Sequence, residues 1–123
     1  PHTQALNFPM LKVSSNNQTI SITGSALDFA SLARSIKKSK FGSTKIIESE
    51  ASSIELNCSG KGVELLSFDD KVVFKYSEST KNELYTLISM PSDTAIGAVF
   101  TIRTAEHSAL FDGNSMGLEL IVE

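Results

Sequence analysis

The amino-acid sequence predicts an α+β fold, in which a mainly antiparallel sheet of about five to eight strands has one or two helices packed on one face. Several segments alternate apolar and polar residues with the period of two that is typical of a half-buried strand. One segment, over residues 26–40, instead repeats its apolar residues at helical spacing. The chain has 123 residues, of which 41% are hydrophobic, and this is enough for one core. We therefore expect a single α+β domain over residues 11–123, preceded by an irregular N-terminal arm over residues 1–10.

The first elements of this domain are expected to form a β-hairpin. Residues 11–13 and 19–23 are short runs of aliphatic and β-branched side chains, and a polar turn at 14–17 separates them. Polar residues of this kind are typical of hairpin loops. Gly24 then ends the second strand.

The helix over residues 26–40 is predicted from both of its ends and from one face. Ser25 and Asp28 have the spacing of a capping box at its start, and Gly42 offers a left-handed residue after its end. Lysines in the last turn favour the negative end of the helix dipole. A single apolar stripe, which we expect to pack on the sheet, consists of Phe29, Leu32, Ala33 and Ile36.

Residues 44–49 and 53–58 are expected to be the next two strands. In the second of them Ile54, Leu56 and Cys58 fall on one face, which predicts that this face is buried.

A further hairpin is expected around Asp69 and Asp70. These two residues separate an apolar segment at 63–68 from another at 71–76, which is the spacing of a tight two-residue loop.

Residues 81–90 fit both a helix and a strand, and we favour the helix. Their apolar residues have helical spacing, and Thr80 with Glu83 has the spacing of a second capping box. The stretch 85–88 would also suit a strand, and Pro91 ends the element in either case.

The C-terminal part of the chain is expected to add a long strand at 95–104, with Gly97 at a bulge, and a final strand at 118–122. These two strands would offer an exposed sheet edge.

The composition excludes several classes of protein. No apolar run approaches the roughly 18 to 20 residues of a membrane-spanning helix, so we expect no membrane insertion. The single cysteine excludes a disulfide framework, and no spacing typical of a metal or phosphate site occurs, so we expect no cofactor and no metal. A lone thiol favours a cytoplasmic location, with a periplasmic one left open if a signal peptide preceded Pro1.

Charge is unevenly divided along the chain. Residues 1–45 carry six basic groups and one acid, whereas residues 46–123 carry five basic groups and thirteen acids, for an overall net charge of −3. This balance and the lack of an arginine-rich or aromatic binding motif argue against a nucleic-acid partner. A division of this kind favours association with a partner of opposite sign.

Two residues are candidates for catalytic groups. His107 shares a loop with Ser108 and Asp112, which is the set of groups that a small hydrolase would need for a relay. Neighbouring loop residues usually point in different directions, however, so we do not expect these side chains to converge. Cys58 is expected to face the core rather than to act as a nucleophile with His107. We therefore expect no enzyme, with catalysis around His107 as the third hypothesis.

The acidic residues of the second half are the expected partner-binding residues, because they would give a sheet face that attracts a basic protein. They are Glu48, Glu50, Glu55, Glu64, Asp69 and Asp70.

The stretch from Gln18 to Ala33 is a strand, a glycine turn and then a helix, and it is followed by the strand at 53–58 and another hairpin. This pattern, over about residues 11–90, resembles the small α+β immunity proteins that bacteria encode beside polymorphic toxins. The resemblance implies non-covalent inhibition of a cognate toxin, often a nuclease with a basic cleft, by a protein that plugs its active site. It carries over no binding residue by motif.

A structural or assembly subunit is the competing hypothesis, for example a phage or secretion-system component that associates through its edge strands. In either case we expect a monomer or a homodimer with a protein partner.

Overall fold

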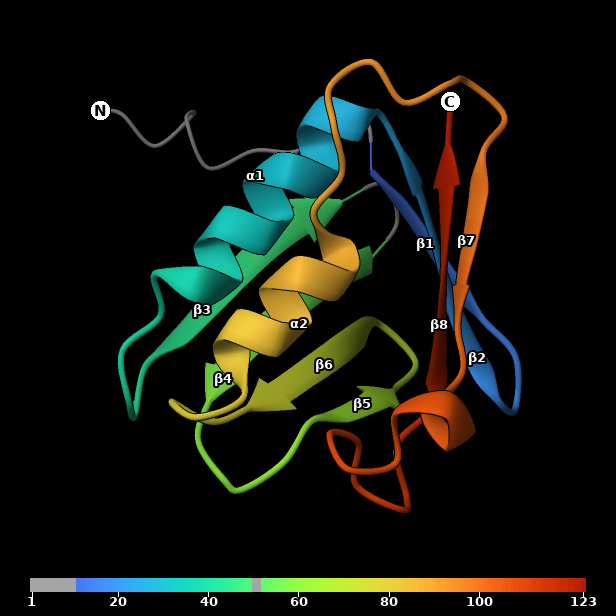
Figure 1. Cartoon of the computed structure of the whole chain (residues 1–123). Coiled ribbons are helices and arrows are strands. Elements are labelled where there is room, and N and C mark those ends of the chain that lie inside the picture. The colour runs from blue at the N-terminus through green and yellow to red at the C-terminus, as the bar shows by residue number, and fades with distance from the viewer. Residues whose placement is uncertain (1–10, 50–51) are drawn as a thin grey trace.

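The structure, a computed structural model, describes residues 11–49 and 52–123. The two helices lie side by side in front of one sheet, and a second sheet stands beside them (Figure 1). The elements in chain order are β1 (Lys12–Ser15), β2 (Thr19–Gly24), α1 (Ala26–Lys37), β3 (Thr44–Ser49), β4 (Ser52–Cys58), β5 (Glu64–Ser67), β6 (Lys71–Tyr76), α2 (Lys81–Ile88), β7 (Val99–Ile102), the 3-10 helix η2 (Thr104–His107) and β8 (Gly117–Val122).

The predicted α+β class is confirmed, and its eight described strands divide into two sheets. Sheet A has the order β1-β2-β8-β7 and sheet B the order β3-β4-β6-β5. In each sheet the two central strands are parallel and the outer pairs are antiparallel. Each helix follows a central strand of one sheet and leads to an edge strand of the other, so the helices join the two sheets.

The chain repeats one arrangement, β-β-α-β-β, in its two halves. Exchanging β1 to β4 for β5 to β8 maps the strand order of sheet A onto that of sheet B. The strand registers agree with this exchange, because the pair Ser21 and Glu119 of sheet A corresponds to the pair Val73 and Glu55 of sheet B. The repeat is one of topology, and it makes each position of sheet A comparable with one position of sheet B.

Helix α1 has the predicted start and the predicted buried stripe. The Asp28 amide donates to Ser25 Oγ at 3.0 Å, and Asp28 Oδ2 accepts from the Ser25 amide at 3.2 Å, which completes the capping box. The helix ends at Lys37 rather than at residue 40, because the chain leaves the helix after the C-cap residue Lys38. Gly42, with φ of 84°, serves the turn into β3 instead of the helix end.

Helix α2 confirms that residues 81–90 favour a helix, but its predicted capping box is absent. Thr80 makes no side-chain bond to the helix. Its Oγ1 instead accepts from the Ser77 amide at 2.9 Å, while Ser77 Oγ accepts from the Thr80 amide at 3.1 Å. In the repeat, Ser77 and Thr80 lie where Ser25 and Asp28 lie in the first half. Thr80 is therefore bonded to Ser77, three residues before it, and not to Glu83, three residues after it.

The predicted long strand at 95–104 is shorter than expected. Only Val99–Ile102 is a strand, because residues 95–98 form a turn in which the Ala98 amide donates to Ala95 O at 3.1 Å. Gly97 does lie at a bulge, with φ of 96°: its amide donates to Val122 O at 2.7 Å, and the Val122 amide donates to Ala98 O at 2.9 Å.

The expected exposed edge is supplied by β7 alone. The terminal strand was expected at residues 118–122, and β8 (Gly117–Val122) lies there, but it sits between β2 and β7 and has both edges paired. The sequence pattern of a single strand does not contain its neighbours, so its edge or central position could not be predicted.

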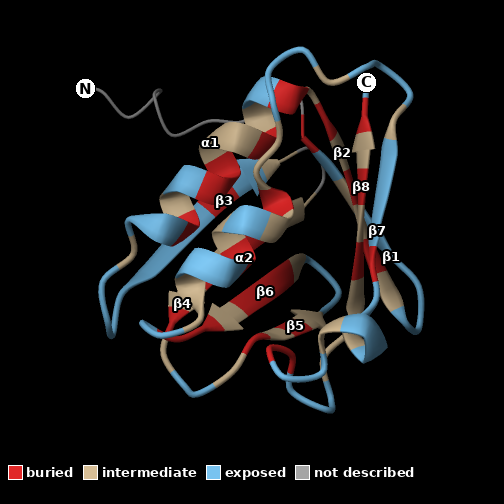
Figure 2. Cartoon of the chain, viewed as in Figure 1, coloured by how far each residue is buried: buried red, intermediate tan, exposed pale blue. Residues whose placement is uncertain are grey.

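One core cluster joins both helices to the inner faces of both sheets. The stripe of α1 is fully buried, and Leu84 and Ile88 of α2 are equally buried beside it. Figure 2 shows the buried residues along the helices and strands and the exposed ones mainly over the loops and β7. Ile54, Leu56 and Cys58 of β4 are buried as predicted.

A polar network ties the end of α1 to the start of α2. Tyr76 Oη and Ser39 Oγ lie 2.6 Å apart, and Lys81 Nζ donates to Ser39 O at 2.7 Å. Lys81 also pairs with Glu78 at 2.9 Å, and Glu78 accepts from the Phe41 amide at 2.9 Å. The bonds from Lys81 and from the Phe41 amide hold the pKa of Glu78 below its ordinary value. This network fixes the two helix ends relative to β6.

Candidate protein-binding face

The face of sheet B that points away from the helices carries most of the acidic residues that the sequence singles out. We call it the outer face of sheet B. Alternation along the strands places Glu48, Glu55 and Glu64 on it, because Ile47, Ile54 and Leu65 point into the core. Asp69 and Asp70 form the two-residue loop between β5 and β6, with the Phe68 amide bonded to Lys71 O at 2.8 Å, so the predicted tight hairpin is confirmed. Glu50 lies outside the described residues.

The acids do not form a face of one sign. Lys71 Nζ lies 3.0 Å from Glu55 Oε1, and the Glu55 side chain is only 17% exposed. In the register of β5 and β6, Glu64 stands opposite Lys75. Two of the predicted acids are therefore balanced by lysines of β6, and the remaining negative charge lies with Glu48 and the two aspartates of the loop.

The centre of the outer face of sheet B is apolar. One row across the four strands runs Ile46, Glu55, Val73 and Leu66, so three of its four side chains are aliphatic. Val73 is only 4% exposed and yet does not belong to the core cluster, which shows that residues of this face cover it. Ile46 is 45% exposed at one end of the row, and Phe68, next to the other end, is 54% exposed.

The apolar row opens into a recess of about 480 Å³. Its apolar part consists of Leu66, Phe68 and Val73, and its rim of Glu55, Asp70, Lys71 and Lys75. An apolar floor with a charged rim of both signs is suited to a protein side chain that has an aliphatic or aromatic stem and a polar end.

The equivalent row of sheet A is polar, which gives an internal comparison. There the side chains are Thr101, Glu119, Ser21 and Ser14, at the positions that Ile46, Glu55, Val73 and Leu66 occupy in sheet B. The central glutamate is common to both rows. In sheet A it accepts from Ser21 Oγ at 3.0 Å, whereas in sheet B it pairs with Lys71. The same fold thus tolerates a wholly polar row, so the apolar row of sheet B is not a requirement of the architecture.

These apolar residues were not among the predicted binding residues, although the sequence contains a signal for them. Three strands of sheet B hold adjacent apolar residues, at 46–47, 65–66 and 72–74. Because strand side chains alternate between faces, at least one member of each run has to point away from the core. All three outward members meet on the outer face of sheet B.

Cys58 and His107, the two candidate catalytic residues, do not lie on the outer face of sheet B and are not hydrogen-bonded to each other. Cys58 is fully buried, and burial, with Glu78 nearby, raises the pKa of its thiol. The ring of His107 contacts Phe111 edge-on at 6.3 Å, and His107 lines a shallow recess with Leu87 of α2. Within residues 11–49 and 52–123 no hydrogen bond joins the His107 side chain to Ser108, Asp112 or Cys58, and no group of three or more His, Cys, Asp or Glu side chains is placed to hold a metal ion.

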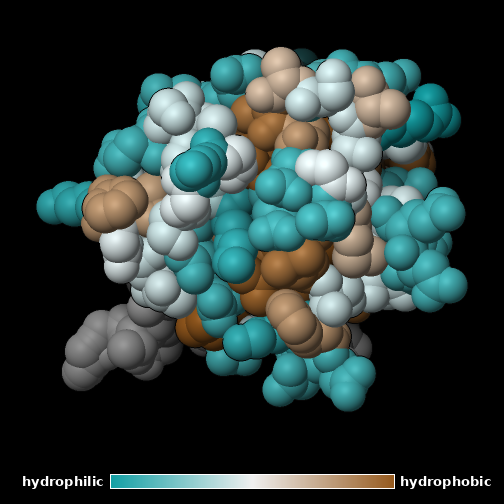
Figure 3. All heavy atoms as spheres, turned by 90° about the horizontal axis from the view of Figure 1, so that it is seen from below, coloured by the Kyte–Doolittle hydropathy of each residue, from teal (hydrophilic) through white to brown (hydrophobic). Residues whose placement is uncertain are grey.

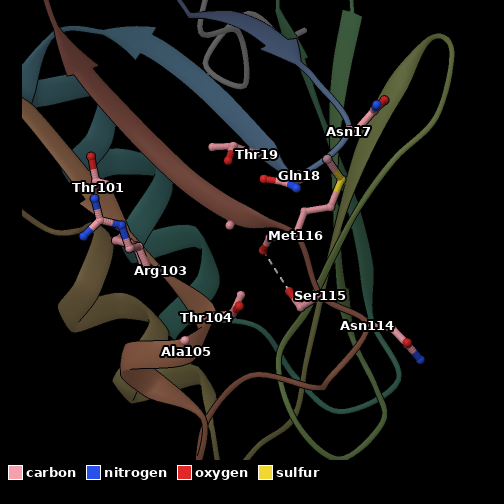
Figure 4. Close-up of a pocket in the computed structure, with 12 residues that line it drawn as sticks. Asn17, Gln18, Thr19, Thr101, Arg103, Thr104, Ala105, Asn114, Ser115 and Met116 are labelled. Atoms are coloured by element: carbon pink, nitrogen blue, oxygen red, sulfur yellow. Dashed lines mark hydrogen bonds between the residues drawn. The ribbon is translucent and has the colours of Figure 1, made fainter.

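A second recess of about 480 Å³ lies between the β1–β2 turn, the end of β7 and residues 114–117 (Figure 4). Its twelve lining residues include hydroxyl and amide side chains and one charged group, Arg103, but no carboxylate or imidazole. In the close-up, Ser115 lies opposite Thr104, and the Met116 side chain extends toward Asn17. Such a lining offers hydrogen bonds but no acid–base pair.

The end of the molecule that lies at the bottom of Figure 1 is seen directly in Figure 3, where hydrophobic surface is exposed at its centre among hydrophilic atoms.

No helix in the described part of the chain is both long and apolar enough to cross a bilayer.

Comparisons of the chain with models of protein families, with curated proteins and with solved structures find no match. Among the surfaces of the described residues, the outer face of sheet B combines an apolar centre with a rim of charges of both signs.

Proposed function

We propose that this chain is a non-catalytic protein-binding domain that engages a partner through the outer face of sheet B. The observation that carries the proposal is the apolar row of Ile46, Val73 and Leu66 beside the exposed ring of Phe68. Protein interfaces combine a small apolar centre, often with an aromatic anchor, and a charged rim that stays partly hydrated. The polar row at the equivalent positions of sheet A supports the choice of sheet B.

The charges of the rim favour a basic partner. Glu48, Asp69 and Asp70 have no lysine directly opposite them in the strand register, and all three lie at the same end of the strands, beside the apolar row. Acids in this position speed the encounter with a basic surface and fix its orientation, while the apolar centre supplies most of the affinity. The ion pair of Glu55 with Lys71 is already formed in the free chain and so needs no reorganisation on binding.

The more specific proposal is an immunity-type inhibitor that occludes the active site of a cognate bacterial toxin. It rests on the resemblance of residues 11–90 to such proteins, and the whole outer face of sheet B lies within that stretch. A toxin that acts on nucleic acid has a basic cleft, which the acids around Phe68 would complement. With its single cysteine as a free thiol, we place the inhibitor in the cytoplasm.

The test compares what co-purifies with the tagged wild-type chain and with Phe68→Ser in the organism that encodes the chain. Mass spectrometry of the wild-type complex is expected to find a stoichiometric basic protein. Truncation of an aromatic anchor at a hot spot costs about 2 kcal/mol or more, so recovery of this protein with Phe68→Ser should fall at least about tenfold. Phe68 is exposed, so the variant should fold normally.

The matched control is Phe41→Ser, which removes another exposed aromatic ring, here in the turn between α1 and β3. It should recover the partner as well as the wild type does. If Phe41→Ser loses the partner and Phe68→Ser keeps it, the proposed face is wrong. The inhibitor function is then decided by co-expression: the captured partner should be toxic alone and harmless with the wild-type chain.

A further inference from the structure

We propose that the free edge of β7 pairs with β7 of a second copy of this chain, in antiparallel orientation, to form a homodimer with a continuous eight-stranded sheet. The proposal is independent of the outer face of sheet B, because β7 lies in sheet A. It follows from three features of this edge: its exposure, its lack of charged side chains, and the pattern of its free hydrogen-bonding groups.

The β7 edge is apolar and open. Strand β7 pairs only with β8, and within the described parts of the chain no other backbone group bonds to it. Val99 is 52% exposed, Phe100 41% and the preceding Ile96 83%. Figure 2 shows β7 as an exposed strand on the outside of sheet A. Three large apolar side chains are thus gathered on one unpaired edge.

The other three sheet edges are protected, each in a different way. The edge of β5 is covered by residues 110–116: the Met116 amide donates to Leu65 O at 2.9 Å, and Ser115 Oγ accepts from the Leu65 amide at 2.8 Å. Strand β1 carries Lys12. Strand β3 carries Lys45 and Glu48. Charges and covering loops are the usual means by which proteins prevent edge-to-edge association.

The comparison between β3 and β7 is the most informative, because the internal repeat makes these strands equivalent. Both are edge strands that follow a helix, and their registers place Phe100 of β7 where Lys45 lies on β3. The strand β7 itself, Val-Phe-Thr-Ile, carries no charge. Where one half of the chain has a lysine on its edge strand, the other half has an aromatic ring.

The hydrogen-bond pattern fixes the register of the dimer. Bonds to β8 alternate along β7, and Ala98 O accepts from the Val122 amide, so the N–H and C=O groups of Val99 and Thr101 point to the free edge. A twofold axis beside Phe100 would place Val99 of one copy opposite Thr101 of the other. Both residues would then exchange two hydrogen bonds, and the two Phe100 rings would meet at the axis.

The residues at the ends of β7 are compatible with this antiparallel pairing of two copies. Arg103 follows the strand at one end and pairs with Glu106 of its own chain at 3.7 Å. At the other end lies Gly97, whose amide bonds to Val122 O. In the register above, Arg103 stands opposite Gly97 of the second copy, so no like charges meet. A parallel pairing would instead bring Arg103 against Arg103.

Sedimentation velocity over about a hundredfold range of concentration tests the proposal, since a dimer dissociates on dilution. The wild-type chain is expected to change from dimer to monomer across the range. Val99→Lys restores a protecting charge and should raise the dissociation constant at least about tenfold. Phe68→Ser, on the other sheet, is the matched control and should dimerise as the wild type does.

A wild-type chain that stays monomeric at all concentrations overturns the proposal, and so does a dimer that Val99→Lys leaves intact. Thermal unfolding of each variant, expected to match the wild type because these side chains are exposed, separates loss of pairing from loss of folding.

Discussion

Tyr76 shows how a single buried polar group makes the stability of this fold depend on pH. The residue is fully buried at the end of β6, and its hydroxyl lies 2.6 Å from Ser39 Oγ. Burial penalises the phenolate and raises the pKa of Tyr76 to about 12, although the hydrogen bond with Ser39 opposes this shift. The unfolded chain has an ordinary tyrosine pKa of about 10. Above pH 10 the unfolded state therefore releases a proton that the folded state keeps.

The expected consequence is a loss of stability between about pH 10 and 12, at up to about 1.4 kcal/mol per pH unit from this residue. Urea unfolding of the wild type and of Tyr76→Phe at pH 8 and pH 11 measures it. The free energy of unfolding should fall more steeply with pH for the wild type, because phenylalanine has no proton to lose. Equal slopes for the two proteins would mean that Tyr76 titrates normally in the folded state.

The residues of the binding face illustrate which part of a site the sequence can predict. The acids Glu48, Glu55 and Glu64 were assigned to the polar side of their strands, and they lie on the outer face of sheet B. The ion pair of Glu55 with Lys71 could not be predicted, because it depends on which strands are neighbours. Phe68 was not singled out, because an aromatic residue beside a turn has the same local pattern whether it is covered or exposed.

At the scale of elements, the start of α1 is stabilised by a capping box whose two hydrogen bonds are both present. Ser25→Ala removes the acceptor for the Asp28 amide and should lower the free energy of unfolding by about 1 kcal/mol. Denaturant unfolding at neutral pH measures this loss.

Glu83→Gln is the matched comparison for that measurement. Glu83 was expected to complete a second capping box with Thr80, but α2 has no side-chain cap bond and uses Ser77 instead. Its substitution should change the free energy of unfolding by no more than about 0.5 kcal/mol, as for an ordinary surface site. If both variants lose the same stability, the capping assignment at α1 is wrong.

The local elements were largely predictable, since they depend on neighbours in sequence. The hairpin of β1 and β2, helix α1 and its buried stripe, and the two-residue loop at Asp69 and Asp70 all follow from spacing. The division into two sheets and the central place of β8 do not, because pairing joins strands far apart in the chain. The length of β7 was overestimated, because the apolar residues Ala95 and Ile96 belong to a turn that precedes the strand.

At the scale of the whole molecule, the internal repeat gives two equivalent halves with different surfaces. Sheet B has an apolar row where sheet A has a polar one, and β7 has an open apolar edge where β3 has a charged one. The two proposed interfaces thus lie on different sheets and can be occupied at the same time. Each half of the repeat serves as the control for the other, because both proposed interfaces use residues that the fold itself does not require.

The most direct test of the central claim, that the outer face of sheet B holds the partner, is site-specific photo-cross-linking. The photoreactive residue p-benzoylphenylalanine replaces Phe68 in one chain and Phe100 in another, so each replacement substitutes one exposed aromatic ring for another. Illumination in the organism that encodes the chain should join position 68 to the basic partner and position 100 to a second copy of the chain. Cross-links to the partner from position 100, with none from position 68, would contradict the account.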